Sequence, residues 1–334
     1  MIDKNNIYLT PVQVDIREIN SEPGPFSMSF EFDLADLLNS IEKIGILNPP
    51  FVIKGRSETM EIVTGFRRIH ALKKLGWDSV ACIDLSNAGY SDLELLLLNL
   101  HENLTIREFN DVEKSMVLIR LLRYMPRDDI EKMYVKILKI NKPADLDLLV
   151  RVDKFDPAVK KSIADRKISL SVAGILSGMD SNTRILLGSL LTHLNLSINY
   201  QVQLIDYLID ISHAKQTFIS DLLNSNEIKA VLEDENINIP QKAKSFMNTL
   251  RNMRYPVISQ AEKDFHVTIA RIPLPKGVRI KHPPFFEAPG FTAEISFQDG
   301  TDLRSKTRLI AEQSEIENIK VPWKKHDEQD TYNK

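Results

Sequence analysis

Hydrophobic residues in the first part of the chain follow two different spacings. Alternating apolar and polar residues predict an extended segment within 7–20. Apolar residues three and four apart predict a helix over 33–44, with Asp33 as its N-cap and Gly45 just past its end. Further apolar runs predict strands at 51–54, 60–63 and 80–85 and a helix at 66–75. We therefore expect a small α/β domain at residues 1–88.

From residue 89 onward the apolar spacing is helical. Ser91-x-x-Glu94 and Asn110-x-x-Glu113 are capping boxes, and the first of them predicts a helix that ends near His101. Further helices are expected at 110–124, 127–139, 143–153, 157–165, from 169 onward, and, as longer amphipathic helices, across 181–262. Short helices with tight connections are typical of a helix-turn-helix region. We therefore expect a helical domain with such a region at 89–180 and a helical extension at 181–262.

From residue 263 onward the sequence pattern is no longer helical. Clean alternation at 291–297 and a short apolar run at 278–280 predict strands, and Asp299-Gly300 predicts a turn. We expect a small β-containing unit at 263–322 and a disordered polar tail at 323–334. The predicted fold class is α+β: a mixed α/β N-terminal domain, a central all-helical domain and a small C-terminal β-containing unit.

Composition narrows the class of protein. No apolar run in the 334 residues approaches the roughly 18 residues of a membrane span, and no signal-peptide pattern is visible at the N-terminus. We therefore expect a cytoplasmic protein without a membrane partner. The single cysteine, Cys82, excludes an internal disulfide framework and a cysteine-based zinc cluster, and its predicted strand makes it a core residue.

The charge distribution is uneven. A formal net charge of −3 does not indicate a nucleic-acid-binding protein. Residues 241–285, however, contain nine basic and only two acidic side chains. A solvated face and a surface that attracts phosphate both explain this stretch.

Two short segments carry candidate chemistry. Residues 62–71 are expected to form a strand, a turn at Gly65, and a helix whose first turn carries Arg67 and Arg68. Backbone N–H groups at a helix N-terminus, together with guanidinium groups, are suited to holding a phosphate. Glu102 and Asn103, expected just past a helix end, supply the carboxylate and amide oxygens that Mg²⁺ prefers. Together the segments suggest a nucleotide–metal site.

The order of these motifs resembles a known family. Gly45-Ile46-Leu47-Asn48-Pro49, then Gly65-Phe66-Arg67-Arg68-Ile69-His70-Ala71, then the stretch from Glu102 to Glu113 are similar to motifs of ParB-type partition proteins. Those motifs read Gly-hydrophobic-Leu-Gln-Pro, Gly-Glu-Arg-Arg-x-x-Ala, and Glu-Asn-x-Gln-Arg followed by Leu-Asn-Pro-x-Glu. The resemblance covers about 12–178, and beyond 180 no specific similarity is visible.

The resemblance implies a ligand set and a partner. Family members bind CTP with Mg²⁺ and use it to close a homodimeric clamp around DNA, which implies association with a nucleoid or plasmid. Carried over by position, the residues implied to contact nucleotide are Gly45, Ile46, Asn48, Pro49, Gly65, Phe66, Arg67, Arg68 and Arg107, and the implied metal ligands are Glu102 and Asn103.

This chain departs from the family pattern at several of these positions. Phe66 stands where the family has Glu, which removes a charge beside the phosphates, and Asn48 stands where it has Gln. Thr105-Ile106 occupies the Gln-Arg positions, so that Arg107 falls one residue late. These differences leave open which nucleotide is bound and whether the protein is a slow CTPase.

The helix-turn-helix departs further. Its helices would be 130–138 and 144–152, and the second offers Ala144, Asp145 and Asp147 where a groove-reading helix normally carries Arg, Gln, Asn or Ser. Aspartates facing phosphates weaken DNA binding. We therefore expect DNA to be held without strong sequence specificity, through cations of the basic stretch: Lys242, Lys244, Arg251 and Arg254.

Other functions fit the same domain. Some ParB-like domains phosphorylate small molecules or have been described as nucleases, and a kinase needs a carboxylate base, for which Glu18 and Glu22 are the candidates. Sulfiredoxin shares the fold, but its chemistry needs a cysteine in the phosphate turn, where Phe66 stands. An adaptor that has lost nucleotide binding is a further alternative. His70 and His101 are either phosphate contacts or structural histidines.

Overall fold

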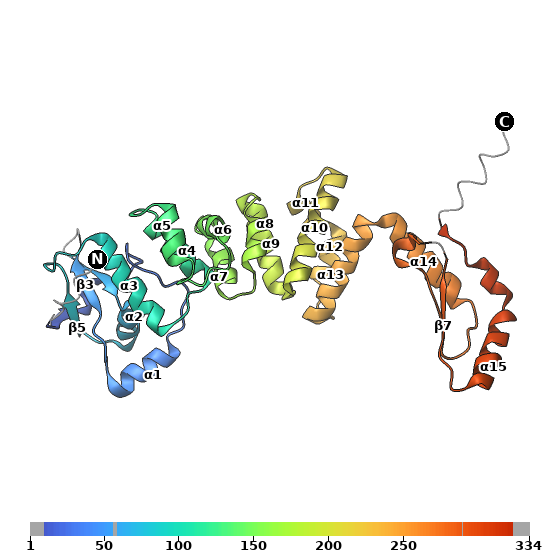
Figure 1. Ribbon diagram of the computed structural model, residues 1–334, viewed down its shortest axis with the longest axis horizontal. Coiled ribbons are helices and arrows are strands. Elements are labelled where there is room, and N and C mark those ends of the chain that lie inside the picture. The colour runs from blue at the N-terminus through green and yellow to red at the C-terminus, as the bar shows by residue number, and fades with distance from the viewer. Residues whose placement is uncertain (1–9, 56–58, 289, 323–334) are drawn as a thin grey trace. The chain divides into compact units, whose positions relative to one another are not determined.

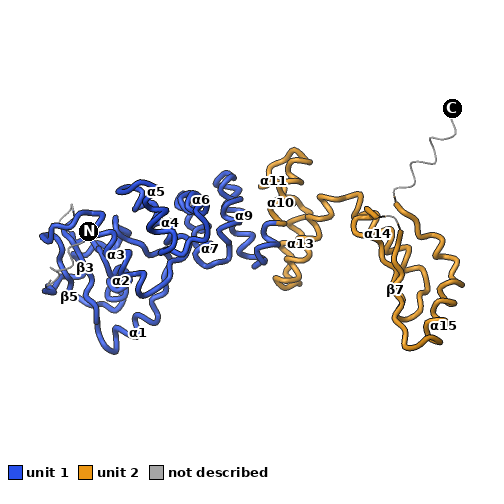
Figure 2. The backbone as a smooth tube through the Cα atoms, viewed as in Figure 1, with its two compact units in different colours: residues 1–202 blue, residues 203–334 orange. Residues whose placement is uncertain are grey.

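The computed structural model describes residues 10–55, 59–288 and 290–322 (Figure 1). Its contacts divide the chain into two compact units, residues 1–202 and 203–334 (Figure 2). The first residues of the extended segment, the tip of the 55–59 loop, Pro289 and the expected tail at 323–334 lie outside the described residues. The finer division into five parts stays a prediction.

A five-stranded mixed sheet forms the centre of the N-terminal part. Its strands are β1 (Val12–Asp15), β2 (Ile19–Asn20), β3 (Phe51–Lys54), β4 (Met60–Thr64) and β5 (Ser79–Asp84), in the order β1-β5-β3-β4-β2. β1 is antiparallel to β5 and β3 to β4, while β3 with β5 and β2 with β4 are parallel. The three strands predicted from apolar runs are therefore confirmed to within one residue at their ends.

Helices cover both faces of this sheet. One face packs against α1 (Ala35–Ile44) and α2 (Phe66–Leu75), and the other against α3 (Asp92–Ile106). Cys82 is fully buried in the first of these cores, as expected, and this burial raises the pKa of its thiol to about 11. The thiol is therefore protonated at neutral pH and unreactive.

The predicted N-cap of α1 is wrong by one residue. Leu34, which already has helical backbone angles, is the N-cap, and the carboxylate of Asp33 instead accepts a hydrogen bond from the N–H of Ala35 at 2.9 Å. Gly45 ends the helix with φ +71°, as its predicted position past the last turn requires.

The predicted end of α3 is also wrong. The helix continues beyond His101 to Ile106, so Glu102 and Asn103 lie inside it rather than past its end. Leu104 packs against the core that α3 shares with the sheet, and this contact favours one further helical turn. The two candidate metal ligands are therefore neighbours on a regular helix.

Helices make up the rest of the first unit. They are α4 (Asp111–Leu121), α5 (Arg127–Tyr134), α6 (Asp145–Val152), α7 (Pro157–Ala164), α8 (Leu170–Leu176), α9 (Ser181–Leu194) and the beginning of α10 (Ile198–Lys215). Both predicted capping boxes form, and Ser169 caps α8 as expected. α4 and α5 are shorter than expected, because turns occupy 122–124 and 135–139. Whether α5 and α6 act as a helix-turn-helix stays a prediction.

The second unit begins with helices and ends with a small sheet. After most of α10 come α11 (Ile219–Leu223), α12 (Asn226–Leu232), α13 (Ile239–Arg254), α14 (Pro256–Ala270), the antiparallel strands β6 (Val278–Lys281) and β7 (Thr292–Ile295), and α15 (Gly300–Ala311). The predicted turn at 299–300 is instead the start of α15, where the Asp299 carboxylate accepts from the N–H of Asp302 at 2.8 Å. None of the described helices is long and apolar enough to cross a lipid bilayer.

Candidate functional site

The turn between β4 and α2 leaves a helix N-terminus open. Gly65 has φ +84°, a left-handed conformation that favours glycine, and a Cβ there would lie 2.9 Å from the Cβ of Pro50. No side-chain oxygen of the described residues caps the first turn of α2. The backbone N–H groups and the positive end of the helix dipole are therefore available to an anion.

Arg68 ties this helix start to two other segments. Its guanidinium donates to the Glu102 carboxylate of α3 at 2.5 Å and to the main-chain carbonyl of Asn48. The Arg68 side chain is 17% exposed and that of Glu102 is 28% exposed. The Asn48 loop, the glycine turn and α3, which are distant in sequence, thus meet at one place.

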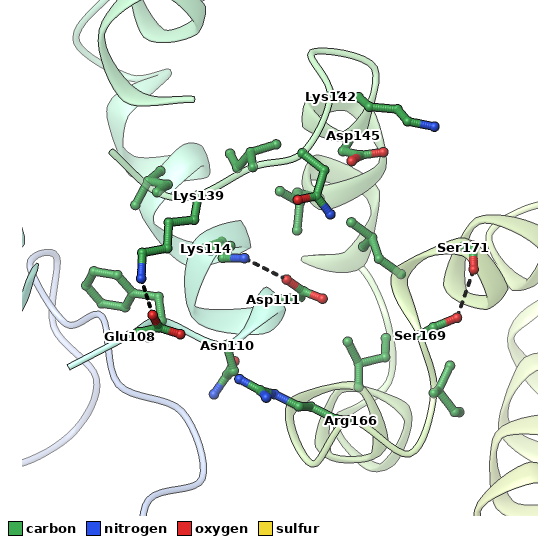
Figure 3. A pocket seen from close by; sticks show the side chains of 18 of the residues that line it. Glu108, Asn110, Asp111, Lys114, Lys139, Lys142, Asp145, Arg166, Ser169 and Ser171 are labelled. Atoms are coloured by element: carbon green, nitrogen blue, oxygen red, sulfur yellow. Dashed lines mark hydrogen bonds and ion pairs between the residues drawn. The ribbon is translucent and has the colours of Figure 1, made fainter. Parts of the chain in front are cut away.

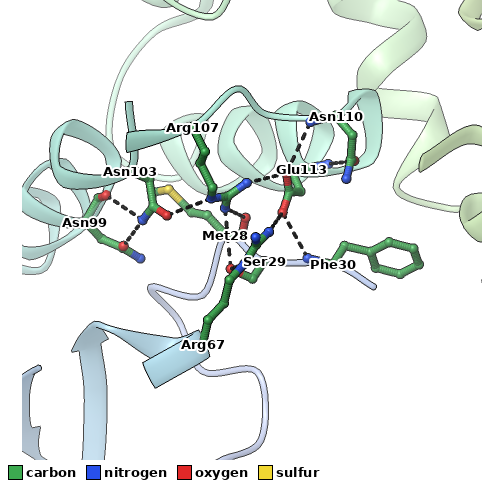
Figure 4. A network of polar contacts seen from close by, with 9 residues as sticks. All are labelled: Met28, Ser29, Phe30, Arg67, Asn99, Asn103, Arg107, Asn110 and Glu113. Carbon is green, nitrogen blue, oxygen red and sulfur yellow. Dashed lines mark hydrogen bonds and ion pairs between the residues drawn. The ribbon is translucent and has the colours of Figure 1, made fainter. Parts of the chain in front are cut away.

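A second cluster, the Glu113 network, joins Arg67 to α3 and α4 (Figure 4). The Glu113 side chain is only 1% exposed. Its Oε1 accepts from Arg67 at 2.9 Å, and its Oε2 accepts from Arg107 at 2.5 Å. The N–H groups of Phe30 and Asn110 also donate to this carboxylate, at 3.3 and 3.1 Å. One buried carboxylate therefore fixes two candidate phosphate-binding arginines.

The Glu113 network carries more positive than negative charge. Arg67 also donates to the Ser29 hydroxyl at 3.3 Å, and Arg107 approaches the same oxygen at 3.4 Å. Burial, followed by the neighbouring Arg107 guanidinium, lowers the pKa of Arg67, and the Glu113 carboxylate offsets part of this effect. An arginine stays protonated nonetheless, so the two guanidinium groups leave a local surplus of one charge.

The two candidate metal ligands have different partners. Glu102 pairs with Arg68, whereas the side-chain oxygen of Asn103 accepts from Arg107 Nε at 2.9 Å. Asn103 also donates to the carbonyl and side-chain oxygens of Asn99, at 3.0 and 2.6 Å. Across the described residues no three His, Cys, Asp or Glu side chains are grouped to hold a metal ion. Both candidate metal ligands therefore pair with guanidinium groups in this structure.

The remaining expected nucleotide residues flank the turn. Ile46 packs beside α1 and α2, while Phe66 lies against His70, with 4.5 Å between ring centroids, and against Phe32 at 5.9 Å. A ring nitrogen of His70 is 3.0 Å from the carbonyl oxygen of Ser21, which supports a structural role. Phe66 therefore packs within this aromatic group, where the family's Glu would add a charge.

Comparison with known proteins assigns this part of the chain. Residues 2–104 match the family model of the ParB N-terminal domain. The chain carries a ParB N-terminal domain. The range matched includes β1 to β5, α1, α2 and nearly all of α3, so it contains both the glycine turn and the Glu102–Asn103 pair.

The individual relatives share little sequence identity with this chain. Stage 0 sporulation protein J of Bacillus subtilis is 23% identical over 235 residues, which are 69% of this chain and 71% of the relative. The probable chromosome-partitioning protein ParB of Campylobacter jejuni is 26% identical over 53% of this chain and 60% of its own length. A solved structure of C-terminally truncated chromosome-partitioning protein ParB from Caulobacter crescentus, complexed with CTP-γ-S, is 19% identical over 54% of this chain and 98% of that chain, with a TM-score of 0.26.

The carboxylates considered for a kinase lie apart from the arginines. Glu18 and Glu22 are both exposed, and the contacts of the described residues join neither side chain to Arg67, Arg68 or Arg107. No contact of the described residues therefore places either candidate base beside these arginines.

The basic stretch expected to hold DNA is largely engaged within the second unit. Lys242 donates to the carbonyl of Leu232 at 2.6 Å, Arg251 pairs with Glu262 at 2.6 Å, and Arg254 pairs with Asp210. Of the four candidate cations, only the exposed Lys244 has no hydrogen bond or ion pair within the described part of the chain. Their role in DNA binding stays a prediction.

A cavity of about 890 Å³ opens beside the expected helix-turn-helix (Figure 3). The first residues of α4 and α6, the connection at 137–142 and the segment 166–171 line it. Lys139 pairs with Glu108, but Lys142 and Arg166 are exposed and have no hydrogen bond or ion pair to another described side chain. Two cations at this cavity are therefore free to meet a phosphate.

Sequence reasoning missed the residue on which the site depends. In the sequence, Glu113 ends the stretch that resembles the family motifs and forms part of a capping box with Asn110, which the structure confirms. No sequence signal indicated that Arg67 and Arg107 would share its carboxylate, because neither helical spacing nor a turn joins them.

Replacement of Gly65 tests the turn. We expect Gly65→Ala to cost about 1–2 kcal/mol for the left-handed backbone and about 1–3 kcal/mol more for the close approach to Pro50. Gly76→Ala is the matched control, because Gly76 has φ +73° with nothing within 4 Å of the added Cβ. Urea unfolding measures both, and an equal destabilisation of the two variants would mean that Pro50 does not constrain the turn.

Neutralising Glu113 tests the network. Glu113→Gln should reduce the free energy of unfolding by about 3–5 kcal/mol, because two arginines are then left without their buried counterion. Glu102→Gln, which removes a partly exposed partner of one arginine, should cost less than about 1 kcal/mol. A similar destabilisation of the two variants in urea unfolding would contradict a central role for Glu113.

Proposed function

We propose that this chain is a nucleotide-dependent DNA-partitioning protein, whose ParB N-terminal domain binds the triphosphate of CTP. The observation that carries the proposal is the uncapped N-terminus of α2, with Gly65 at its entry and Arg67 and Arg68 on its first turn. The match of residues 2–104 to the ParB N-terminal domain supports the choice of nucleotide over other phosphates. CTP itself follows from the family resemblance.

The phosphates enter a place where each arginine already has an anionic partner. Arg68 is the most replaceable contact, because its partner Glu102 is partly exposed and can turn toward water when a phosphate takes its place. Arg67 is fixed by its ion pair with buried Glu113. Its N–H groups that do not contact Glu113 are therefore held in a constant direction. Such preorganisation reduces the entropic cost of ordering the site when the ligand binds.

The resulting role is that of a ligand-controlled binder rather than a catalyst. A ligand shifts a conformational equilibrium only by its differential affinity for the two states. Here the phosphate site contacts α2 and α3, and the Glu113 network continues from it into α4. Nucleotide binding can therefore influence the helical region that follows the ParB domain. We propose that this region, in a homodimer, is the part that engages DNA.

The nucleotide proposal is tested by calorimetric titration with CTP, ATP, GTP and UTP. We expect CTP to bind most tightly. Arg68→Gln should weaken it by roughly 10- to 150-fold, the value of a charge-assisted hydrogen bond of about 1.5–3 kcal/mol. Lys74→Gln is the matched control, since it removes an exposed cation from the last turn of the same helix.

Two results would contradict this proposal. Preferred binding of ATP or ADP would favour the kinase alternative, and no binding of any nucleotide would favour the adaptor.

The cavity beside α6 is the proposed place of DNA contact. Lys142 and Arg166 are exposed and unpaired there, whereas three of the four cations at 242–254 have partners inside the second unit. Asp145 lines the same cavity, so DNA binding is expected to be weak and without sequence preference.

Charge reversal distinguishes DNA contact at the cavity from DNA contact at the basic stretch. The slope of log K against log salt for duplex DNA should become shallower by about 0.9 for each phosphate that is no longer neutralised, hence by about 1.8 in Lys142→Glu/Arg166→Glu. Fluorescence anisotropy at several salt concentrations measures this slope. An unchanged slope in the double variant, with a shallower slope in Lys244→Glu, would move DNA to the basic stretch instead.

A further inference from the structure

Glu102 and Asn103 do not face a common point. They are adjacent residues within α3, and side chains of adjacent helical residues point about 100° apart. Glu102 is directed to Arg68 on α2, and Asn103 is directed to Arg107 at the end of its own helix. Even when a phosphate displaces Glu102 from Arg68, a cation bound to both side chains would have to share the Asn103 oxygen with Arg107.

The side-chain oxygen that Asn103 would offer to a metal ion already faces the guanidinium group of Arg107. Its Oδ1 accepts from Arg107 Nε at 2.9 Å, and its Nδ2 is held by Asn99. Asn99 is itself buried and donates to the carbonyl of Phe26 at 2.5 Å, which prevents the amide pair from simply rotating. A metal ion and a guanidinium group that share one oxygen would repel each other strongly, because the oxygen is partly buried.

Arg107 is fixed from several sides. Besides Asn103, its guanidinium donates to Glu113 at 2.5 Å and to the carbonyl of Met28 at 3.0 Å, and it lies over the Phe109 ring at 4.5 Å from the centroid. The side chain is 15% exposed. Its positive charge is therefore a permanent part of the site.

The site has a net positive charge without any added ion, and it therefore favours an anion. Arg67, Arg68 and Arg107 face only two carboxylates, Glu102 and Glu113. The uncapped start of α2 adds the positive end of its dipole.

We propose that Arg107 supplies the charge that a divalent cation would otherwise bring, so that triphosphate binding does not depend on a metal ion held by Glu102 and Asn103. The inference rests on the proposed nucleotide function. Glu102 acts as a competing partner of Arg68, and Asn103 acts as a positioning residue for Arg107. This departs from the role that the family resemblance implies for both residues.

Titration of the full chain with CTP, in Mg²⁺ and then in EDTA, tests the inference. We expect the dissociation constant to change by less than about tenfold between the two buffers. A weakening of more than tenfold in EDTA would overturn the inference and leave the nucleotide function intact. Absence of binding in both buffers would overturn the proposed function itself.

Variants distinguish the two alternative roles of Glu102, as a competing partner of Arg68 or as a metal ligand. If it competes for Arg68, Glu102→Gln should bind CTP up to about fivefold more tightly, and equally in Mg²⁺ and EDTA. If it is a metal ligand, the same variant should bind more weakly, and only in Mg²⁺. Glu108→Gln, on the exposed partner of Lys139, is the matched control. Because Arg107→Gln also strips a partner from buried Glu113, Glu102→Gln is the decisive variant.

Discussion

The buried carboxylate of Glu113 is the group on which the candidate site depends. A charge with 1% of its side chain exposed is tolerated only when it is paired and hydrogen-bonded, and here two guanidinium groups and two backbone N–H groups meet it. These donors come from the 26–30 loop, from α2, from the end of α3 and from the start of α4. One side chain thus joins the sheet domain to the helices that follow.

The apolar core also continues beyond the ParB domain. The cluster on the α3 face of the sheet extends into α4, α5 and α6. Apolar burial holds the helices in place without specifying direction, whereas the ion pairs require Arg67 and Arg107 at defined positions. A ligand that contacts Arg67 therefore acts on a side chain whose ion pair with Glu113 reaches α4.

The chemistry of the site follows from the balance of charges rather than from any single group. In the proposed site, three arginines and an open helix start attract phosphate, and two carboxylates keep the arginines ordered when no phosphate is bound. Asn103, which resembles a metal ligand in sequence, orients Arg107 in the structure. Glu102 and Asn103, whose residue types suit a metal ion, thus both pair with guanidinium groups here because of the neighbours that the fold gives them.

Local features were predictable from the sequence because they depend on neighbours in the chain. The capping boxes at Ser91 and Asn110, the glycine at the end of α1 and the strand–glycine–helix turn at Gly65 each need only a few consecutive residues. The motifs around this turn also identified the ParB N-terminal domain. By itself, then, the sequence determined the three later strands, the helices α1 and α2 and the turn at which we propose that phosphate binds. It did not indicate the 3₁₀ helix Ile16–Glu18, which interrupts the expected extended segment.

Only the tertiary structure decided how charged side chains are paired and where some helices end. α3 was expected to end near His101 but continues to Ile106, because the packing of Leu104 against the core is not visible in a local pattern. Arg251 and Arg254, expected from the sequence to contact DNA, pair in the structure with Glu262 on the following helix and with Asp210 on α10. A charged side chain looks the same in sequence whether it faces water, a ligand or a buried partner, because its partners are set by the folding of distant segments against each other.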